Sequence, residues 1–352
     1  MDHPYKNLEQ RAFWKAAVSN LNPLAFQDIY RPKFPITKAT AIAAAGSCFA
    51  QHIGRQFKDR GYRFIDVEPA PRFLGERDIS RFGFDLYSAR YGNIYSVRQL
   101  LQLFQRAFGL FTPEETVWES KGRFYDPFRP SIEPNGFATR EEAERDIEYH
   151  LKQVRAILSR TQLFVFTFGL TEGWINTQDG SALPTCPGTI AGEYDDQKYA
   201  FHNYTHAEVL EDAKAFIEFA LARAPNMKFM FTVSPVPLTA TASGHHVLPA
   251  TVYSKSVLRG VCGELYEQFP QVDYFPSYEL VSSHPMRAMA YNPNLRSVAT
   301  EGVHHVMDVF FNAIGDEPSA DTAEAAPEKP APEPKSADDL ACDELILQEF
   351  GE

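Results

Sequence analysis

Ser47 and Cys48 stand at a turn between a strand and a helix, where a nucleophile is well placed. The run Ala41–Ala45 is uniformly apolar, which is typical of a short strand buried on both faces of a parallel sheet. Gly46 ends this run, and apolar residues then recur at helical spacing over 49–57. Free N–H groups at a helix N-terminus stabilise negative charge, so a hydroxyl or thiol here can attack an acyl group. A structural interpretation is also open, in which Ser47 is only the N-cap of the helix.

Cys48 offers a second nucleophile at the same turn. A thiol at a helix N-terminus ionises more readily than a free thiol and is then reactive. However, the residue that follows a nucleophile on a helical turn points about 100° away from it, toward the packed side. We therefore expect Cys48 to be a buried structural residue, and its thiol remains the minor alternative to Ser47.

Four sequence blocks resemble a known family. Residues 46–50 read Gly-Ser-Cys-Phe-Ala, the motif after which the GSCFA family is named. Three further blocks follow in order: TFGLTEGW at 167–174, FTVSPV at 231–236 and YFPSYE at 274–279. Together they cover about residues 5–312. The GSCFA family in turn resembles the SGNH (GDSL-like) hydrolases, in which the turn after the first strand carries the nucleophile. The resemblance thus implies that Ser47 is the catalytic serine.

The same resemblance implies a general base and an acid that orients it. SGNH enzymes carry an Asp-x-x-His block before the last helix, in which the histidine is the base and the acid fixes its imidazole. Glu301 and His304 have this spacing, with glutamate in place of aspartate, whereas His305 has Gly302 at the corresponding position. The base must lie within hydrogen-bond reach of the serine Oγ. We therefore expect Glu301 and His304 to complete a triad with Ser47.

Four more residues are candidates for the oxyanion hole or for substrate contact. In SGNH enzymes a glycine N–H on a loop after the second strand stabilises the oxyanion. The resemblance therefore implies this role for Gly92, and the side-chain amide of Asn93 could add a second donor. The alternative is that Gly92 and Asn93 only form a turn. Where SGNH enzymes have Gly-x-Asn-Asp/Glu, this chain has Thr171 and Glu172. A threonine hydroxyl donates one hydrogen bond and reaches less far than an amide. The departure weakens the expectation of a standard esterase, and Glu172 is by default an ordinary carboxylate at a helix start.

Metal and cofactor signals are missing from the sequence. The 4 cysteines are scattered without a CxxC pair, which argues against a disulfide framework and a zinc site. His202 and His206 stand four apart without the glutamate of an HExxH motif, and two ligands alone make no zinc site. We expect no metal and no bound cofactor, with acyl-CoA as a co-substrate if the enzyme is a transferase.

The net charge of −12 is concentrated near the C-terminus. Residues 316–352 hold 12 Asp and Glu against 2 Lys, a net of −10. The rest of the chain is nearly neutral, so neither a nucleic-acid footprint nor a basic membrane patch is expected. No apolar run approaches the ~20 residues of a membrane span, and the first residues lack the apolar region of a signal peptide. With the scattered cysteines, this favours a cytoplasmic protein.

Strand and helix signals alternate along the chain and predict a parallel sheet covered by helices on both faces. Strands are predicted at 41–45, 62–67, 162–168, 228–233 and 272–275. Helices are predicted at 49–57, 96–108, 140–160, 206–224, 254–269 and 305–313. Residues 174–202 show no clear period and are interpreted as a long loop. We expect a three-layer α/β/α domain, flavodoxin-like in the manner of SGNH hydrolases.

The expected catalytic domain spans residues 37–315. Before it we expect an N-terminal arm at 1–36 that packs on the core. Within it, an insertion near 112–137, rich in Pro, Gly and aromatic residues, is expected over the active-site end of the sheet. After it we expect a disordered acidic linker at 316–339. Residues 340–352 form a short apolar peptide, which is either a frayed tail or a helix that docks on a protein partner.

Sequence and resemblance together predict a carboxylic-ester hydrolase acting on acyl, and in particular acetyl, esters of a carbohydrate or polysaccharide precursor. The substrate class comes from the resemblance, since relatives look linked to surface polysaccharide synthesis. An O-acyltransferase is the first alternative, and it requires a water-poor site. A non-catalytic scaffold of the same fold is the second, favoured by Thr171, by Glu301 and by the apolar C-terminal peptide.

Overall fold

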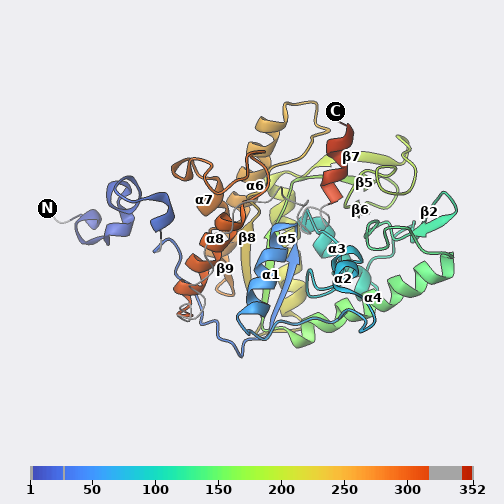
Figure 1. Ribbon diagram of the computed structural model, residues 1–352, viewed down its shortest axis with the longest axis horizontal. Coiled ribbons are helices and arrows are strands. Elements are labelled where there is room, and N and C mark those ends of the chain that lie inside the picture. Colours follow the sequence, from blue (N-terminus) through green and yellow to red (C-terminus); the bar gives the residue numbers. More distant parts are fainter. Residues whose placement is uncertain (1–2, 27, 317–342, 351–352) are drawn as a thin grey trace.

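A parallel four-stranded sheet forms the centre of the computed structural model (Figure 1). The structure describes residues 3–26, 28–316 and 343–350. The strands, hydrogen-bonded in this order, are β1 (Ile42–Gly46), β4 (Leu163–Phe168), β8 (Lys228–Val233) and β9 (Val272–Tyr274). Every pair is parallel, as the sequence predicts. Parallel neighbours need crossover connections, which the helices between the strands supply.

Side chains of the sheet alternate between two cores. On β1, Ala43 and Ala45 face one core, whereas Ile42 and Ala44 face the other. The first core is covered by α3 (Val97–Ala107), α4 (Arg140–Arg160), α5 (His206–Leu221) and α6 (Val247–Gln268). The second is covered by α1 (Phe49–Asp59), α7 (Ser277–Ser282) and α8 (Thr300–Ala313). The predicted three-layer α/β/α arrangement is therefore confirmed.

The predicted strand Tyr62–Val67 does not form as a strand. The segment meets β1 at one isolated parallel bridge, between Ile42 and Phe64. Farther along β1, Ser88 pairs with β1 instead of the segment Tyr62–Val67, because Ala44 N donates to Ser88 Oγ at 2.9 Å. With this segment counted as the edge position, the order along the sheet is the 2-1-3-4-5 of flavodoxin-like folds. Its switch point, where such folds bind ligands, lies at the carboxyl ends of β1 and β4.

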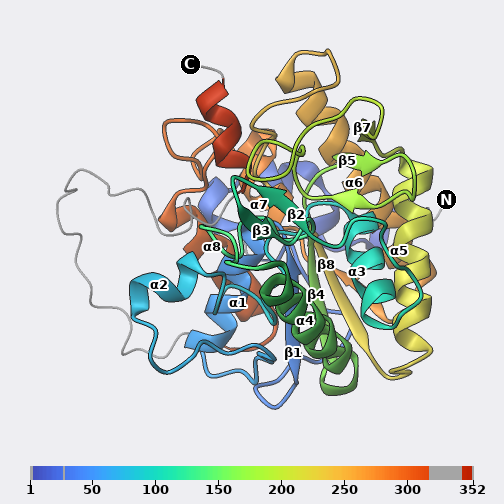
Figure 2. The same cartoon turned by 90° about the vertical axis from the view of Figure 1, so that its right-hand side faces the viewer.

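The stretch 174–202, predicted as a loop, contains most of an antiparallel sheet. β5 (Glu172–Asn176) pairs with both β6 (Ala182–Leu183) and β7 (Tyr199–Asn203). A separate hairpin, β2 (Trp118–Ser120) with β3 (Arg123–Tyr125), precedes α4. Figure 2 shows the antiparallel sheet at the same end of the molecule as the C-terminal segment. Because β4 runs directly into β5, this is the end at which the parallel strands finish.

Two helices begin earlier than the sequence predicts. α6 starts at Val247, where the His246 side chain accepts a hydrogen bond from Leu248 N and caps the helix. α8 starts at Thr300, so Glu301 and His304 lie in its first turns instead of before it. The shorter helix α2 (Glu76–Arg81) lies between the bridge segment and α3.

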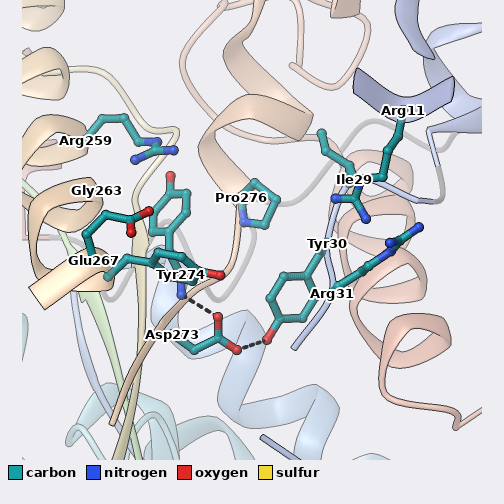
Figure 3. A pocket seen from close by; sticks show the side chains of 11 residues that line it. Arg11, Ile29, Tyr30, Arg31, Arg259, Gly263, Glu267, Asp273, Tyr274 and Pro276 are labelled. Atoms are coloured by element: carbon teal, nitrogen blue, oxygen red, sulfur yellow. Dashed lines mark hydrogen bonds between the residues drawn. The ribbon is translucent and has the colours of Figure 1, made fainter. Parts of the chain in front are cut away.

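The N-terminal arm packs along the β9 edge of the sheet (Figure 3). Its short turns are Pro4–Asn7, Gln10–Ala12 and Pro23–Ala25, with a π-helical turn at Lys15–Ser19. Tyr30 OH donates to the buried Asp273 carboxylate at 2.7 Å, and Lys33 N donates to the same oxygen at 3.0 Å. The Tyr30 ring stacks on Phe310 of α8. The arm thus supplies hydrogen-bond donors to a buried carboxylate on the edge strand.

The C-terminal segment Asp343–Phe350 forms a 3-10 helix. Asp343 is buried and accepts a hydrogen bond of 3.3 Å from Asn93 Nδ2. The segment therefore docks on its own chain next to a predicted site residue. Apart from Asp316, the predicted linker at 316–339 lies outside the described residues, as do residues 340–342 and 351–352.

Candidate active site

Ser47 is positioned by the close contact that the residue before it, Gly46, makes with β4. Gly46 has φ +142°, and a Cβ on it would lie 2.6 Å from Thr167 O of the neighbouring strand. Only glycine fits there. The chain then turns into α1, with Cys48 at the N-cap position and without any side-chain cap hydrogen bond. Ser47 therefore precedes the cap, and the interpretation of this serine as a helix cap is wrong.

The Ser47 hydroxyl is buried and unsatisfied. Ser47 is 5% exposed, and its Oγ has no hydrogen-bond partner among the residues that the structure describes. A buried hydroxyl without a partner costs about 1–3 kcal/mol. It faces a cavity of about 10 Å³, roughly the space of one water molecule. The cavity is lined by Ser47, Cys48, Tyr95, Gly169, Leu170, Ser234, Val236 and Lys255.

Gly169 brings the end of β4 against the serine. Its N–H and that of Leu170 both donate to Tyr95 O, at 3.1 and 3.0 Å. A Cβ on Gly169 would lie 3.0 Å from the Ser47 Cβ and 2.9 Å from Tyr95 O. The absence of a side chain at this position therefore allows three chain segments to converge on Ser47.

Lys255 of α6 is a site residue that sequence reasoning missed. It is 1% exposed, and its Nζ donates to Gly169 O at 2.7 Å. A signal was present, because Lys255 shares the buried face of α6 with Leu258 and Cys262 at helical spacing. A lysine is rarely buried to this extent, so its place in the Ser47 cavity indicates a specific role.

Cys48 lies in the same cavity but is only partly buried. The expectation that Cys48 is buried is therefore not met, because the residue keeps part of its surface exposed.

Gly92 and Asn93 lie on the loop beside the nucleophile turn. Gly92 has φ +68°, in the left-handed region, and Ile94 N donates to Gly46 O at 2.9 Å. Asn93 is 4% exposed, and its Oδ1 accepts a hydrogen bond of 2.6 Å from Tyr87 OH. This bond fixes the amide so that its Nδ2 points at the Asp343 carboxylate. The loop is thus anchored to the residue immediately before Ser47.

The side chains of Thr171 and Glu172 make hydrogen bonds outside the Ser47 cavity. The Thr171 hydroxyl is fully buried and donates to Asn203 Oδ1 at 2.7 Å. Glu172 Oε1 accepts from Thr241 at 2.7 Å, and burial raises the pKa of its carboxyl. In this arrangement the Thr171 proton is engaged within the antiparallel sheet.

Glu301 and His304 lie on the exposed side of α8. α8 packs against α1, and Gly302 lies against Ala290, where a Cβ would come within 2.6 Å of the Ala290 carbonyl oxygen. Since Ser47 Oγ is unpaired within the described chain, His304 does not hydrogen-bond it in this structure. A histidine base would have to approach the serine on substrate binding, as catalytic hydrogen bonds often tighten only in the complex.

A family model, described as the GSCFA family, matches residues 41–310. The chain belongs to the GSCFA family. The matched part runs from the start of β1 into α8 and so contains Ser47, Lys255 and His304. No curated protein and no solved structure matches the chain.

A larger cavity of this GSCFA protein lies between the N-terminal arm, α6 and β9 (Figure 3). Its volume is about 540 Å³. Its three arginines are already paired: Arg11 with Asp28, Arg31 with both Asp28 and Glu9, and Arg259 with Glu279. Satisfied charges and the lack of a nucleophile make this cavity a weaker candidate than the turn at Ser47.

Metal ligands and membrane-spanning helices were also sought in the GSCFA protein. Over the described ranges, no group of three metal-ligating side chains comes together. His202 Nε2 instead contacts Glu208 Oε1 at 2.8 Å. In that same part of the chain, the helices are too short or too polar to cross a membrane.

Proposed function

We propose that this GSCFA protein is a serine-dependent acyl-ester hydrolase with Ser47 as its nucleophile. The observation that carries the proposal is the unpaired, buried Ser47 Oγ at the switch point of a flavodoxin-like sheet. A structural serine at a strand-to-helix turn would cap the helix, and this one does not. Such a hydroxyl persists at a cost in stability, which is typical of functional sites.

The proposed reaction proceeds through an acyl-enzyme. Ser47 Oγ attacks the ester carbonyl, its proton passes to His304, and Glu301 holds the resulting imidazolium. The ester C–O bond then breaks, and the leaving alcohol takes the proton from His304. Water attacks the acyl-enzyme in the second half with the same base. Glu301 and His304 are assigned here from the family resemblance, and their exposed positions on α8 require that the helix start approach the cavity.

Negative charge on the oxyanion has several donors in reach of the turn. Ala50 N and Gln51 N in the first turn of α1 already donate to Ser47 O and Cys48 O, so the proposed helix-start donors are the N–H groups of Ser47 and Cys48. The family resemblance adds the N–H of Gly92, whose loop is tied to Gly46 through Ile94 N. Lys255 adds an N–H donor in the Ser47 cavity, where it holds the Gly169 carbonyl. In a site closed to water, such fixed donors stabilise the transition state strongly.

The proposed substrate is an acyl ester, with acetyl the simplest acyl group, on a carbohydrate or polysaccharide precursor. The family resemblance supports this class through the link of relatives to surface polysaccharide synthesis. The small size of the cavity, about 10 Å³ beside Ser47, favours a short acyl group. With the expected cytoplasmic location, the substrate would be a precursor and not an exported polymer.

An O-acyltransferase is the second candidate, and the burial of Ser47 favours it. Ser47 is almost fully buried, so bulk water reaches the acyl-enzyme poorly. In this version the serine takes the acyl group from acyl-CoA, whose C–S bond breaks and whose thiolate takes up the proton held by the base. A sugar hydroxyl then replaces water as the attacking group.

The test is covalent labelling of the full chain. An activated acetyl ester and a fluorophosphonate are each incubated with the protein, and the modified residue is located by peptide mass mapping. We expect both labels on Ser47. Release of acetyl to water identifies the hydrolase, and release only to added sugar identifies the transferase. Labelling of Cys48 alone, or of neither residue, would contradict the proposal.

A further inference from the structure

A second polar cavity lies behind the Gly92 loop, away from Ser47. It measures about 20 Å³ and is enclosed by side chains from the loop, α3, α4 and the insertion. Three of the atoms that line it are buried polar atoms with no hydrogen-bond partner in the described chain: Tyr91 Oη, Arg106 Nε and His150 Nε2. Buried polar atoms are nearly always satisfied, so three orphans around one cavity indicate a missing ligand.

Among the three residues, Arg106 gives the strongest indication that the missing ligand is an anion. The residue is 8% exposed, and its buried Nε has no hydrogen-bond partner in the part of the chain that the structure describes. Its guanidinium instead stacks at 3.6 Å on the Phe128 ring. Burial lowers its pKa to about 10, so it is charged at neutral pH. A buried unpaired cation is strongly unfavourable unless an anion joins it.

Neighbouring charges do not neutralise Arg106. The two charged groups that act on it are Asp126 and Arg129, which have opposite signs. Asp126 is already bound to Arg129, whose Nε donates to it at 2.7 Å. Arg129 further donates to Asp146 and to a backbone carbonyl. The guanidinium of Arg106 is therefore left outside a fully paired network.

His150 sets the second requirement on a ligand. Its Nδ1 is 2.7 Å from Glu68 Oε2, and burial lowers the pKa of the imidazole. The neutral ring therefore donates from Nδ1 to Glu68, and Nε2 is left as an acceptor facing the cavity. A ligand must offer oxygen acceptors to Arg106 and Tyr91 and an O–H to His150.

We propose that this cavity binds a small oxyanion that keeps one O–H, of the hydrogencarbonate type, between Arg106, Tyr91 and His150. A single water would satisfy the hydrogen bonds but would leave the Arg106 charge uncompensated. The cavity is too small for a sugar or a nucleotide. Tyr91 precedes Gly92 directly, so the bound anion would hold the loop that is anchored beside Ser47.

The test is thermal unfolding of the full chain at mildly alkaline pH, titrated with hydrogencarbonate against chloride at matched ionic strength. We expect a saturable rise in Tm of a few degrees with hydrogencarbonate and none with chloride, since a ligand of the native state stabilises it by mass action. The rise should be absent in Arg106→Met, while the exposed control Arg145→Met keeps it. Without the anion, Arg106→Met should be at least as stable as the wild type, because it removes an unpaired buried charge.

Tyr91→Phe provides a second variant in case Arg106→Met does not fold. It removes one donor from the cavity and should reduce the affinity for hydrogencarbonate about tenfold, the value of one hydrogen bond to a charged group. Binding of ¹³C-labelled hydrogencarbonate, followed by NMR, measures this directly. The absence of a saturable rise in the wild type, an equal rise with chloride, or an unchanged rise in Arg106→Met would overturn the proposal. None of these readouts depends on ester hydrolysis, so they are independent of the assignment of Ser47.

Discussion

Lys255 Nζ donates a hydrogen bond of 2.7 Å to the carbonyl oxygen of Gly169, and Gly169 is the residue that packs against Ser47. A lysine from α6 thereby holds the end of β4 in place and brings an N–H donor into the cavity of the candidate nucleophile. The bond joins α6 to the block at 167–174, whose Gly169 packs against Ser47 of the block at 46–50.

Lys255→Met should lower kcat for an activated acetyl ester on the order of 10²-fold, with a smaller effect on KM, because a fixed donor acts mainly in the transition state. Lys255→Arg should recover part of the loss. Lys214→Met, on the neighbouring helix α5, is the matched control. If Lys255→Met keeps full kcat, the lysine has only a packing role.

Gly169→Ala should both destabilise the protein by about 1–3 kcal/mol and reduce ester hydrolysis, since the added Cβ overpacks the junction. The contacts at risk are Ser47 Cβ at 3.0 Å and Tyr95 O at 2.9 Å. Gly173→Ala is the control, because its Cβ would meet Tyr204 at an ordinary 3.6 Å. Equal stability and activity of the two variants, by urea unfolding and kinetics, would mean that the approach at Gly169 is not tight.

The docking of the C-terminal segment should strengthen as the pH falls. Burial raises the pKa of the Asp343 carboxyl above its ordinary value of 3.8, against the hydrogen bonds from Ser131 and Asn93. The docked carboxyl therefore binds its proton more tightly than the free one, so acidification through that raised pKa toward 3.8 favours docking.

Amide hydrogen exchange over Asp343–Phe350 measures this docking. We expect the protection factor, which is the intrinsic exchange rate at a given pH divided by the observed rate, to rise at mildly acidic pH in the wild type and to stay constant in Asp343→Asn. Asp308→Asn on the exposed side of α8 should behave as the wild type. A protection factor that falls on acidification would refute the docked arrangement and would revive the prediction that residues 340–352 serve a protein partner.

Glu68 should stabilise the fold at neutral pH and lose this contribution in acid. Burial alone would raise the pKa of its carboxyl, but His150, Arg129 and the Arg90 N–H hold it at about 2, below the ordinary 4.5. Stability from such a group is present above 4.5 and disappears as the pH falls through about 2. The pH dependence of Tm should therefore be flatter in this acid range in Glu68→Gln. Glu148→Gln, exposed on α4, should keep the wild-type slope, and identical slopes in all three proteins would contradict the assignment.

The central sheet could be predicted because its strands are short apolar runs followed by helical spacing. β1, β4 and β8 carry apolar residues on both faces, and Ser47 follows from their order. β5 and β7 escaped prediction because they are short strands whose residues are only partly buried. Tyr62–Val67 has an apolar alternation, but a single bridge replaces its ladder where Ser88 bonds β1 instead.

In the candidate site, only the residues that lie in the family-like sequence blocks could be predicted. Ser47, Gly92 and His304 come from sequence blocks, whereas Lys255 and Arg106 are charged residues on otherwise apolar helix faces. Spacing places both residues on a buried helix face, but lysine and arginine side chains are normally solvated, so spacing does not reveal that their charged ends lie beside a cavity. Their role becomes visible only when the three-dimensional partners, or the lack of them, are known.

The most direct measurement is acetyl ester hydrolysis by the wild type, Ser47→Ala and Cys48→Ala, each checked for folding by circular dichroism. The account predicts that Ser47→Ala loses activity on the order of 10³-fold or more. It should keep or slightly gain stability, because the lost hydroxyl had no partner. Cys48→Ala should retain most of the activity. Full activity in Ser47→Ala, with loss in Cys48→Ala, would contradict the assignment of the serine and move the chemistry to the thiol.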